Sequence, residues 1–174
     1  MVKKKKWFVF KYNIDYKFNW EIPEVIEWPS LIEDLKNEKY KIKYKNKIYY
    51  LVEGFLLFKQ PLCYKFNKSI FIYITKEEAK KRRMETKPVT EEYFETLVWP
   101  NFLRNNYHLA KMKLNKEKKL VGDILVLEST KDTPEEMSDK AIKFIFNKKD
   151  IKRDLKKEQG LLNDIERQYN ELSK

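Results

Sequence analysis

The sequence predicts an α/β fold with a mostly parallel sheet and flanking helices. Strands that are covered on both faces lack a polar side, so short apolar runs without polar alternation indicate buried parallel strands. Three such runs occur, at residues 48–58 (IYYLVEGFLLF), 69–75 (SIFIYIT) and 123–127 (DILVL). Helix-start patterns lie between and after them, which is the strand-then-helix order of a layered α/β domain. At 174 residues the chain is long enough for one domain with a sizeable core.

Helix starts are marked by a Ser or Thr three residues before a Glu. In this capping box, the two side chains accept hydrogen bonds from the first backbone N–H groups of the helix. The pairs are Ser30 with Glu33, Thr75 with Glu78 (for a helix over 76–85), and Thr133 with Glu136. Pro134 supports the third start, because proline suits the first turn of a helix. A further helix is predicted over 91–113, with an interruption at Pro100.

Residues 147–174 predict one amphipathic helix that follows a domain spanning 1–146. Apolar residues recur every seven positions in this segment, but Glu158 takes one of the apolar places. Three heptads with such a slip are too few for a coiled coil. We therefore expect a helix that packs on its own domain, with association of two copies through it as the alternative.

Glycine is scarce, and its scarcity excludes a class of sites. The chain has three glycines, whereas about twelve would be usual at ~7%. Gly54, Gly122 and Gly160 lie so far apart that neither G-x-G-x-x-G nor G-x-x-x-x-G-K-[ST] can be written. No glycine-rich phosphate loop is therefore encoded in these residues.

The charge and the cysteine count narrow the class of protein. A net charge of +11 with 15% aromatic residues would suit a nucleic-acid surface. Only five of the 38 basic residues are Arg, however, and this Lys-rich skew is typical of AT-rich coding, so we rank nucleic-acid binding low. Cys63 and His108 are each single, which excludes an internal disulfide and a Cys/His zinc set. Without an apolar run of ~20 residues or a signal-peptide core, a cytoplasmic protein with no membrane span is expected.

Several blocks of the sequence resemble the nicotinamide riboside kinase family, a branch of the uridine-kinase-like P-loop kinases. They lie between residues 19 and 146 and read NWEIPEVIEWPSLIEDL (19–35), LVEGFLLF (51–58), FIYITKEEAKKRR (71–83), EEYFETLVWPNFL (91–103) and ILVLESTKDTPEE (124–136). The resemblance implies a three-layer fold that phosphorylates nicotinamide riboside with ATP and Mg²⁺ in NAD salvage. The partners it implies are the riboside and ATP.

Glu53 is the candidate for the metal. It would stand at the carboxyl end of the strand over 48–58, and that end faces the ligand in open α/β sheets. A carboxylate there can hold Mg²⁺, directly or through water. The resemblance gives it this catalytic role; the alternative is a residue that merely caps a strand end.

The basic end of the helix over 76–85 is the candidate for phosphate binding, since guanidinium groups match phosphate oxygens. By resemblance, Arg82 would contact the ATP phosphates, Arg83 the riboside, and Lys87 the nucleotide from the lid. Ser129 and Thr130 follow the last strand, where these kinases surround the adenine. A solvated basic helix end is the alternative.

Trp20 and Glu21 match the family's aromatic and acidic pair. There the ring stacks on the nicotinamide and the carboxylate binds the ribose, and a cationic ring gains from the face of an indole. Glu21 stands where the family usually has Asp. The alternative for Trp20 is an ordinary core residue.

The first part of the family's pattern is absent from the sequence. It would include the central strand with its phosphate loop and Lys, and a strand that carries the catalytic Asp. The predicted fold is therefore an incomplete P-loop kinase-like fold without its central strand, and we expect no phosphoryl transfer by this chain. Three hypotheses follow: an incomplete product of a working kinase, a non-catalytic family member that binds a riboside or a partner, and a basic nucleic-acid-binding protein.

Overall fold

A two-stranded parallel sheet lies at the centre of the fold. The computed structural model describes residues 29–30, 33, 42–44, 47–54, 56–58, 66–86, 89–114, 123–147 and 153–172. Strand β3 (Lys68–Tyr73) pairs in parallel with β4 (Asp123–Glu128), and the two strands begin and end opposite each other. These two strands confirm the predictions for 69–75 and 123–127.

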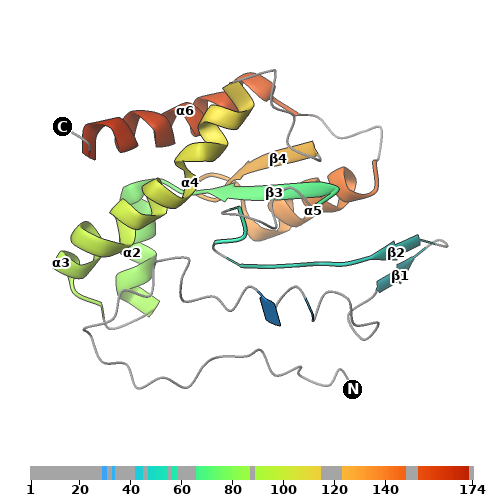
Figure 1. Ribbon diagram of the computed structural model, residues 1–174, viewed down its shortest axis with the longest axis horizontal. Coiled ribbons are helices and arrows are strands. Elements are labelled where there is room, and N and C mark those ends of the chain that lie inside the picture. Colours follow the sequence, from blue (N-terminus) through green and yellow to red (C-terminus); the bar gives the residue numbers. More distant parts are fainter. Residues whose placement is uncertain are drawn as a thin grey trace.

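Helices cover both faces of this sheet (Figure 1). Helices α4 (Trp99–Leu114) and α6 (Leu155–Leu172) lie on one face, and α5 (Pro134–Ile145) lies on the other. The α/β class predicted from the sequence is confirmed.

The core has two parts because side chains alternate between the faces of a strand. Phe71, Tyr73 and Val126 point to the α4 and α6 side, where they join the larger buried cluster. Leu125 and Leu127 point the other way and pack with Phe144 of α5. The larger cluster is completed by Phe94, Trp99, Leu103, Leu109, Leu162 and Ile165.

The prediction of one buried parallel strand over 48–58 is wrong. Strand β2 (Lys47–Tyr49) is short and pairs antiparallel with β1 (Ile42–Tyr44). Beyond it the chain has no strand structure over 50–54, and the side chains of Tyr50 and Leu51 are 45% and 74% exposed. The apolar run indicates that a strand is favourable, but it does not determine which segment pairs with it. Pairing with a segment close in sequence, such as β1, has the lowest cost in loop-closure entropy.

Of the three predicted capping boxes, the one at the start of α5 is confirmed. The Thr133 N–H donates to Glu136 Oε2 (2.8 Å), and the Glu136 N–H donates to Thr133 Oγ1 (3.2 Å). The box predicted for α2 (Lys76–Thr86) does not form, because the Thr75 N–H donates to Thr130 Oγ1 while Glu78 accepts from Arg82. Near the third, Pro29 is already helical, so Ser30 lies inside a helix and not at its cap.

The helical stretch over 91–114 is confirmed, but its irregularity precedes Pro100. A short helix, α3 (Glu91–Tyr93), runs into a π-helical turn, η4 (Phe94–Val98), and then into α4. The Trp99 N–H donates to the Phe94 carbonyl, five residues back. Pro100 lacks an N–H and its ring collides with the preceding turn of a regular helix, and a wider turn gives it room.

The C-terminal segment forms an amphipathic helix, α6, as predicted, but the helix spans Leu155–Leu172 and not 147–174, because Asn147 lies in a turn with φ 51° and residues 153–154 are not helical. Leu162 and Ile165 are buried in the larger core cluster. The Tyr169 ring stacks on Tyr107 of α4, with 4.0 Å between the ring centroids. The helix therefore packs on its own domain, as expected. None of the helices in the described part of the chain has both the length and the apolar character of a membrane span.

Candidate functional site

The segments that follow β3 and β4 are hydrogen-bonded to each other at the carboxyl edge of the sheet. The backbone N–H of Ser129 donates to the Tyr73 carbonyl (2.8 Å), and so does its hydroxyl (3.2 Å). The Thr75 N–H donates to Thr130 Oγ1 (3.1 Å). Two loops that lie 55 residues apart in sequence are thus held in a fixed arrangement where open α/β sheets bind ligands.

Arg82 reaches this edge from α2. Its Nη2 donates to the Ser129 carbonyl (2.9 Å), and its Nε donates to Glu78 Oε1 (2.6 Å). The side chain is 47% exposed. A guanidinium has five N–H donors, and the others meet no partner among the described residues. Arg82 is therefore held in place and still has donors to offer.

Three of the predicted site residues come together here, and they have different roles. Arg82 has donors left for a ligand. Thr130 keeps its own hydroxyl hydrogen, because its oxygen acts as the acceptor for Thr75. Ser129 is 7% exposed and its hydroxyl donates to the backbone, so this residue shapes the loop.

The other basic residues of α2 do not join Arg82 in one phosphate-binding cluster. Lys80 forms ion pairs with Glu91 and Glu95, and the hydrogen bonds that it donates to these carboxylates raise the pKa of Lys80 above its usual range. Lys76 also binds Glu95 (2.6 Å). Arg83 follows Arg82 by about 100° around the helix and is half-buried. Within the predicted cluster, Lys80 is thus paired with acids of α3 and η4, and Arg82 is paired with Glu78 of its own helix.

The remaining predicted site residues are not placed with Arg82. Glu53 is exposed in the segment after β2, so its expected place at the end of a buried strand is wrong. Trp20, Glu21 and Lys87 lie outside the described residues. Among the residues that the structure describes, no three His, Cys, Asp or Glu side chains are grouped as metal ligands. Mg²⁺ is usually held by only one or two carboxylates and keeps most of its waters, so the predicted magnesium site stays a prediction, and we derive no step through this ion.

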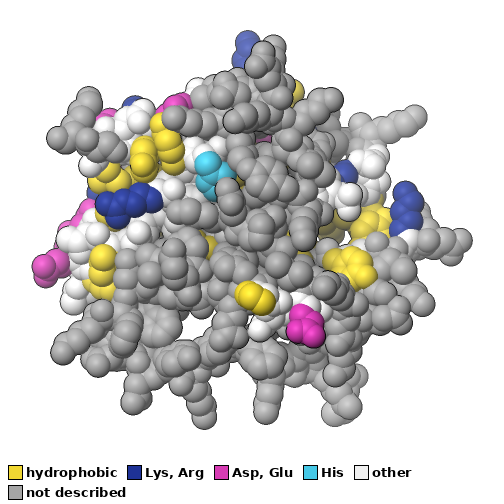
Figure 2. All heavy atoms as spheres, viewed as in Figure 1, with side chains coloured by type: hydrophobic (Ala, Val, Ile, Leu, Met, Phe, Trp, Pro, Cys, Tyr) yellow, Lys and Arg dark blue, Asp and Glu magenta, His cyan; other side chains and the backbone are white. Residues whose placement is uncertain are grey.

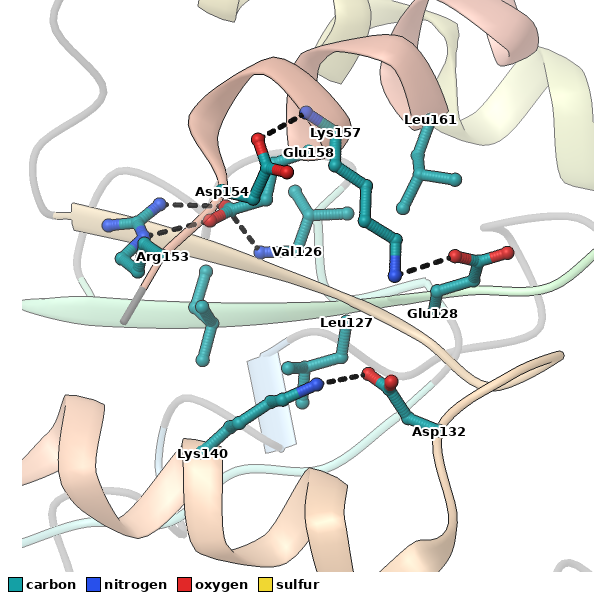
Figure 3. A pocket seen from close by; sticks show the side chains of 11 residues that line it. Val126, Leu127, Glu128, Asp132, Lys140, Arg153, Asp154, Lys157, Glu158 and Leu161 are labelled. Carbon is teal, nitrogen blue, oxygen red and sulfur yellow. Dashed lines mark hydrogen bonds and ion pairs between the residues drawn. The ribbon is translucent and has the colours of Figure 1, made fainter. Parts of the chain in front are cut away.

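A second polar group surrounds a cavity of about 180 Å³ beside β4 (Figure 3). It lies between α5 and the start of α6. Three ion pairs line it: Lys140 with Asp132 (2.7 Å), Arg153 with Glu158 (2.7 Å) and Lys157 with Glu128 (2.9 Å).

The carboxylates of Glu128 and Glu158 are buried in the wall of this cavity, 4% and 5% exposed. The hydrogen bond that Lys157 donates to Glu128 raises the pKa of Lys157 above its ordinary value, so this ammonium group is charged at neutral pH. Glu158 accepts from Arg153 and also from the Val126 N–H (3.0 Å). Buried charges need such partners, because desolvation otherwise costs several kcal/mol.

The motifs of the sequence do not predict this group. The heptad pattern only predicts an apolar residue at the position of Glu158, and no motif assigns a role to Arg153, Glu128 or Lys157. One signal was available. A Glu on the apolar face of a helix, five residues after an Arg, indicates a buried ion pair.

A buried polar chain also connects the sheet to α6. The Tyr73 hydroxyl donates to Asp164 Oδ2 (2.5 Å), which also accepts from Gln168 Nε2 (2.7 Å), and Trp99 Nε1 donates to Gln168 Oε1 (3.0 Å). Burial and the bond to Asp164 raise the pKa of Tyr73 well above its ordinary value. Burial alone would raise the pKa of Asp164, but hydrogen bonds, first of all from Tyr73, hold this pKa below its usual range.

Comparison with protein-family models, with curated proteins and with solved structures finds no match to this chain. The resemblance to nicotinamide riboside kinases therefore depends on the sequence blocks, and it stays a prediction. What the structure provides is an α/β sheet with an arginine held at its carboxyl edge.

Proposed function

We propose that the chain is a nicotinamide riboside kinase-like protein that binds a phosphorylated ligand, ATP or a riboside phosphate, at the carboxyl edge of β3 and β4. The observation that supports this proposal is the placement of Arg82. Its guanidinium bonds to Ser129 at the end of β4 and has further donors for a ligand. The sequence resemblance gives the same residue to the ATP phosphates.

The geometry suits binding of an anion. Charge-assisted hydrogen bonds from Arg to phosphate are about twice as strong as neutral ones, and the planar fork fixes their direction. Glu78 and the Ser129 carbonyl already hold the Arg82 side chain in one orientation. The side chain therefore loses little further freedom when a phosphate binds. Thr130 can add a hydroxyl donor at the same edge.

The proposal is one of binding and not of phosphoryl transfer. Transfer needs a phosphate cradle, a charge-neutralising metal and a group that positions the nucleophile. The 174 residues contain no glycine-rich phosphate loop, and among the described residues no three His, Cys, Asp or Glu side chains are grouped as metal ligands. The incomplete kinase and the non-catalytic family member both predict this, and the proposed binding does not depend on which of the two hypotheses is right.

Nucleic-acid binding is less favoured. Three basic residues of α2, Lys76, Lys80 and Arg82, are paired with acidic side chains. On the face shown in Figure 2, the described Lys and Arg side chains lie scattered at its edges and do not gather into one stripe.

Titration calorimetry of the full chain with ATP, without and with Mg²⁺, tests the proposal. We expect saturable binding that Arg82→Ala weakens by about 10- to 100-fold, because a hydrogen bond to a charged group contributes ~1.5–3 kcal/mol. Lys81→Ala is the matched control: Lys81 is the preceding residue and is exposed, and its loss should change the affinity little. A folded wild-type chain that binds neither ATP nor nicotinamide mononucleotide would contradict the proposal, as would an Arg82→Ala variant with unchanged affinity.

A further inference from the structure

The outer edge of β4 has an unusual partner. Residues of a strand alternate between its two edges, and the Ser129 N–H bonds to the Tyr73 carbonyl on the β3 side. The backbone groups of Ile124, Val126 and Glu128 therefore point away from β3. Two of these groups are bound by side chains: the Ile124 carbonyl accepts from Arg153 Nη2, and the Val126 N–H donates to Glu158 Oε2.

The Arg153–Glu158 ion pair takes the place of one residue of a parallel neighbouring strand. Such a residue would donate its N–H to the Ile124 carbonyl and accept the Val126 N–H at its own carbonyl. Arg153 provides this donor and Glu158 provides this acceptor, and the two side chains also bond to each other (2.7 Å).

The next position along the same edge is open. It consists of the Val126 carbonyl and the Glu128 N–H, and neither group has a partner among the described residues. Val126 and Glu128 are only 5% and 4% exposed, and both line the cavity of Figure 3. An unpaired buried backbone group costs about 1–3 kcal/mol. A molecule in the cavity that pairs with both groups would recover this free energy.

The unpaired part of this edge has the length of one residue, and this length limits which molecules can pair with it. The ion pair closes one end. At the other end the chain turns, and the Glu128 carbonyl accepts from the Asp132 N–H (3.0 Å). An added strand needs several consecutive ladder positions. This edge therefore admits a small molecule and excludes a peptide strand.

The cavity also restricts the size and charge of that molecule. Its volume of about 180 Å³ is below the ~300 Å³ at which sites for drug-sized ligands begin. Leu125, Leu127 and Leu161 supply apolar wall. The lining holds three cations, each paired with a carboxylate, and a fourth carboxylate, Asp154, so the cavity offers no net positive charge to an anion.

We infer that this cavity binds a small, neutral, planar ligand that carries an N–H donor beside an acceptor, as adenine and primary aromatic carboxamides do. The donor pairs with the Val126 carbonyl, and the acceptor receives the Glu128 N–H. The site lies on the outer edge of β4, apart from Arg82, and it stands without the phosphate-binding proposal.

Amide chemical shifts of the ¹⁵N-labelled full chain test the inference directly. The probes are 9-methyladenine and benzamide, and the matched controls are N6,N6,9-trimethyladenine and N,N-dimethylbenzamide, which keep the ring but lack the N–H donor. We expect 9-methyladenine, benzamide or both to move the Glu128 amide signal saturably, at micromolar to millimolar concentration, and the fully N-methylated controls to bind at least tenfold more weakly. Binding of the purine alone would show that the site recognises a purine edge, and binding of benzamide alone would show that it recognises a carboxamide. If neither moves the Glu128 signal, or if the analogues bind equally well, the inference is wrong.

A variant that fills the cavity provides a second test. Leu161→Trp should abolish the shift at Glu128, whereas Leu155→Trp, on the same helix but outside the lining and 58% exposed, should leave it unchanged. Circular dichroism shows whether each variant is folded. Binding that persists in a folded Leu161→Trp chain would place the ligand elsewhere and overturn the assignment.

Discussion

Glu158 links α6 to the edge of the central sheet through its charge. Its heptad position predicts an apolar residue, yet the side chain is buried with its charge and accepts hydrogen bonds from Arg153 and from the Val126 N–H. Removing one member of a buried ion pair leaves the other charge without compensation. Glu158 should therefore contribute more to stability than any exposed carboxylate of the same helix.

Replacing Glu158 by Ala is expected to lower the free energy of unfolding by about 3–5 kcal/mol, the range for breaking a buried pair. Glu158→Gln should cost less, because its amide oxygen can still accept the Val126 N–H. Urea denaturation followed by circular dichroism measures both changes. Glu171→Ala serves as the control, since Glu171 is exposed on the same helix and pairs only with Arg167. Equal effects of Glu158→Ala and Glu171→Ala would show that the buried pair contributes no more than a surface one.

The helices and strands that could be predicted are those whose sequence pattern does not depend on a distant part of the chain. The apolar runs at 69–75 and 123–127 identify the two strands of the central sheet, although Ile72 of β3 is 53% exposed. Thr133 with Glu136 marks the start of α5 by local chemistry alone. The run over 48–58 is just as apolar, but its first residues pair with β1. Choice of partner is a property of the whole chain, and a local pattern does not contain it. The Thr75 box failed for the same reason, since a distant residue, Thr130, took the N–H of Thr75.

The hydrogen bond between Tyr73 of β3 and Asp164 of α6 should make the free energy of unfolding depend on pH in the acidic range. The pKa of Asp164 is depressed in the folded chain, so its contribution is present above the unfolded pKa of about 3.9 and is lost as the pH falls through the folded value. Tyr73→Phe removes one of the bonds that depress it. The variant should therefore lose ~1.5–3 kcal/mol at pH 7, and the loss should shrink below about pH 4.

Thermal unfolding of both chains between pH 7 and pH 2.5 checks this dependence. Tyr50→Phe is the control, because the Tyr50 side chain is 45% exposed. A difference between Tyr73→Phe and the wild type that stays constant over the whole pH range would argue against the role of Asp164.

At the scale of the whole molecule, sequence reasoning found part of the candidate site. Arg82, Ser129 and Thr130 were predicted together and do meet at the carboxyl edge of the sheet. The strand-then-helix order explains this success, because it places the segments after parallel strands at one edge. The hydrogen bonds of Arg153 and Glu158 to β4 could not be predicted in the same way, since they join residues 29 and 32 positions apart that become neighbours only when α6 packs.

Phosphoryl transfer is the whole-molecule property that the residues present do not support. With ATP, Mg²⁺ and nicotinamide riboside, we expect no turnover above a blank without protein, because the glycine-rich cradle for the phosphates is not in the sequence. A coupled assay of ADP formation measures this, with a complete riboside kinase as the positive control. ADP production that scales with the concentration of the chain would overturn the expectation.

The ion pair at the edge of β4 also bears on solubility. An uncovered strand edge is a template on which other chains can add strands and aggregate. Here two of the groups on that edge are covered by side chains at the very start of a helix, where helices fray most readily. Each transient opening of the first turn of α6 would lengthen the bare edge of β4 from one residue to two. Resistance to self-association would then depend on how firmly one helical turn stays closed.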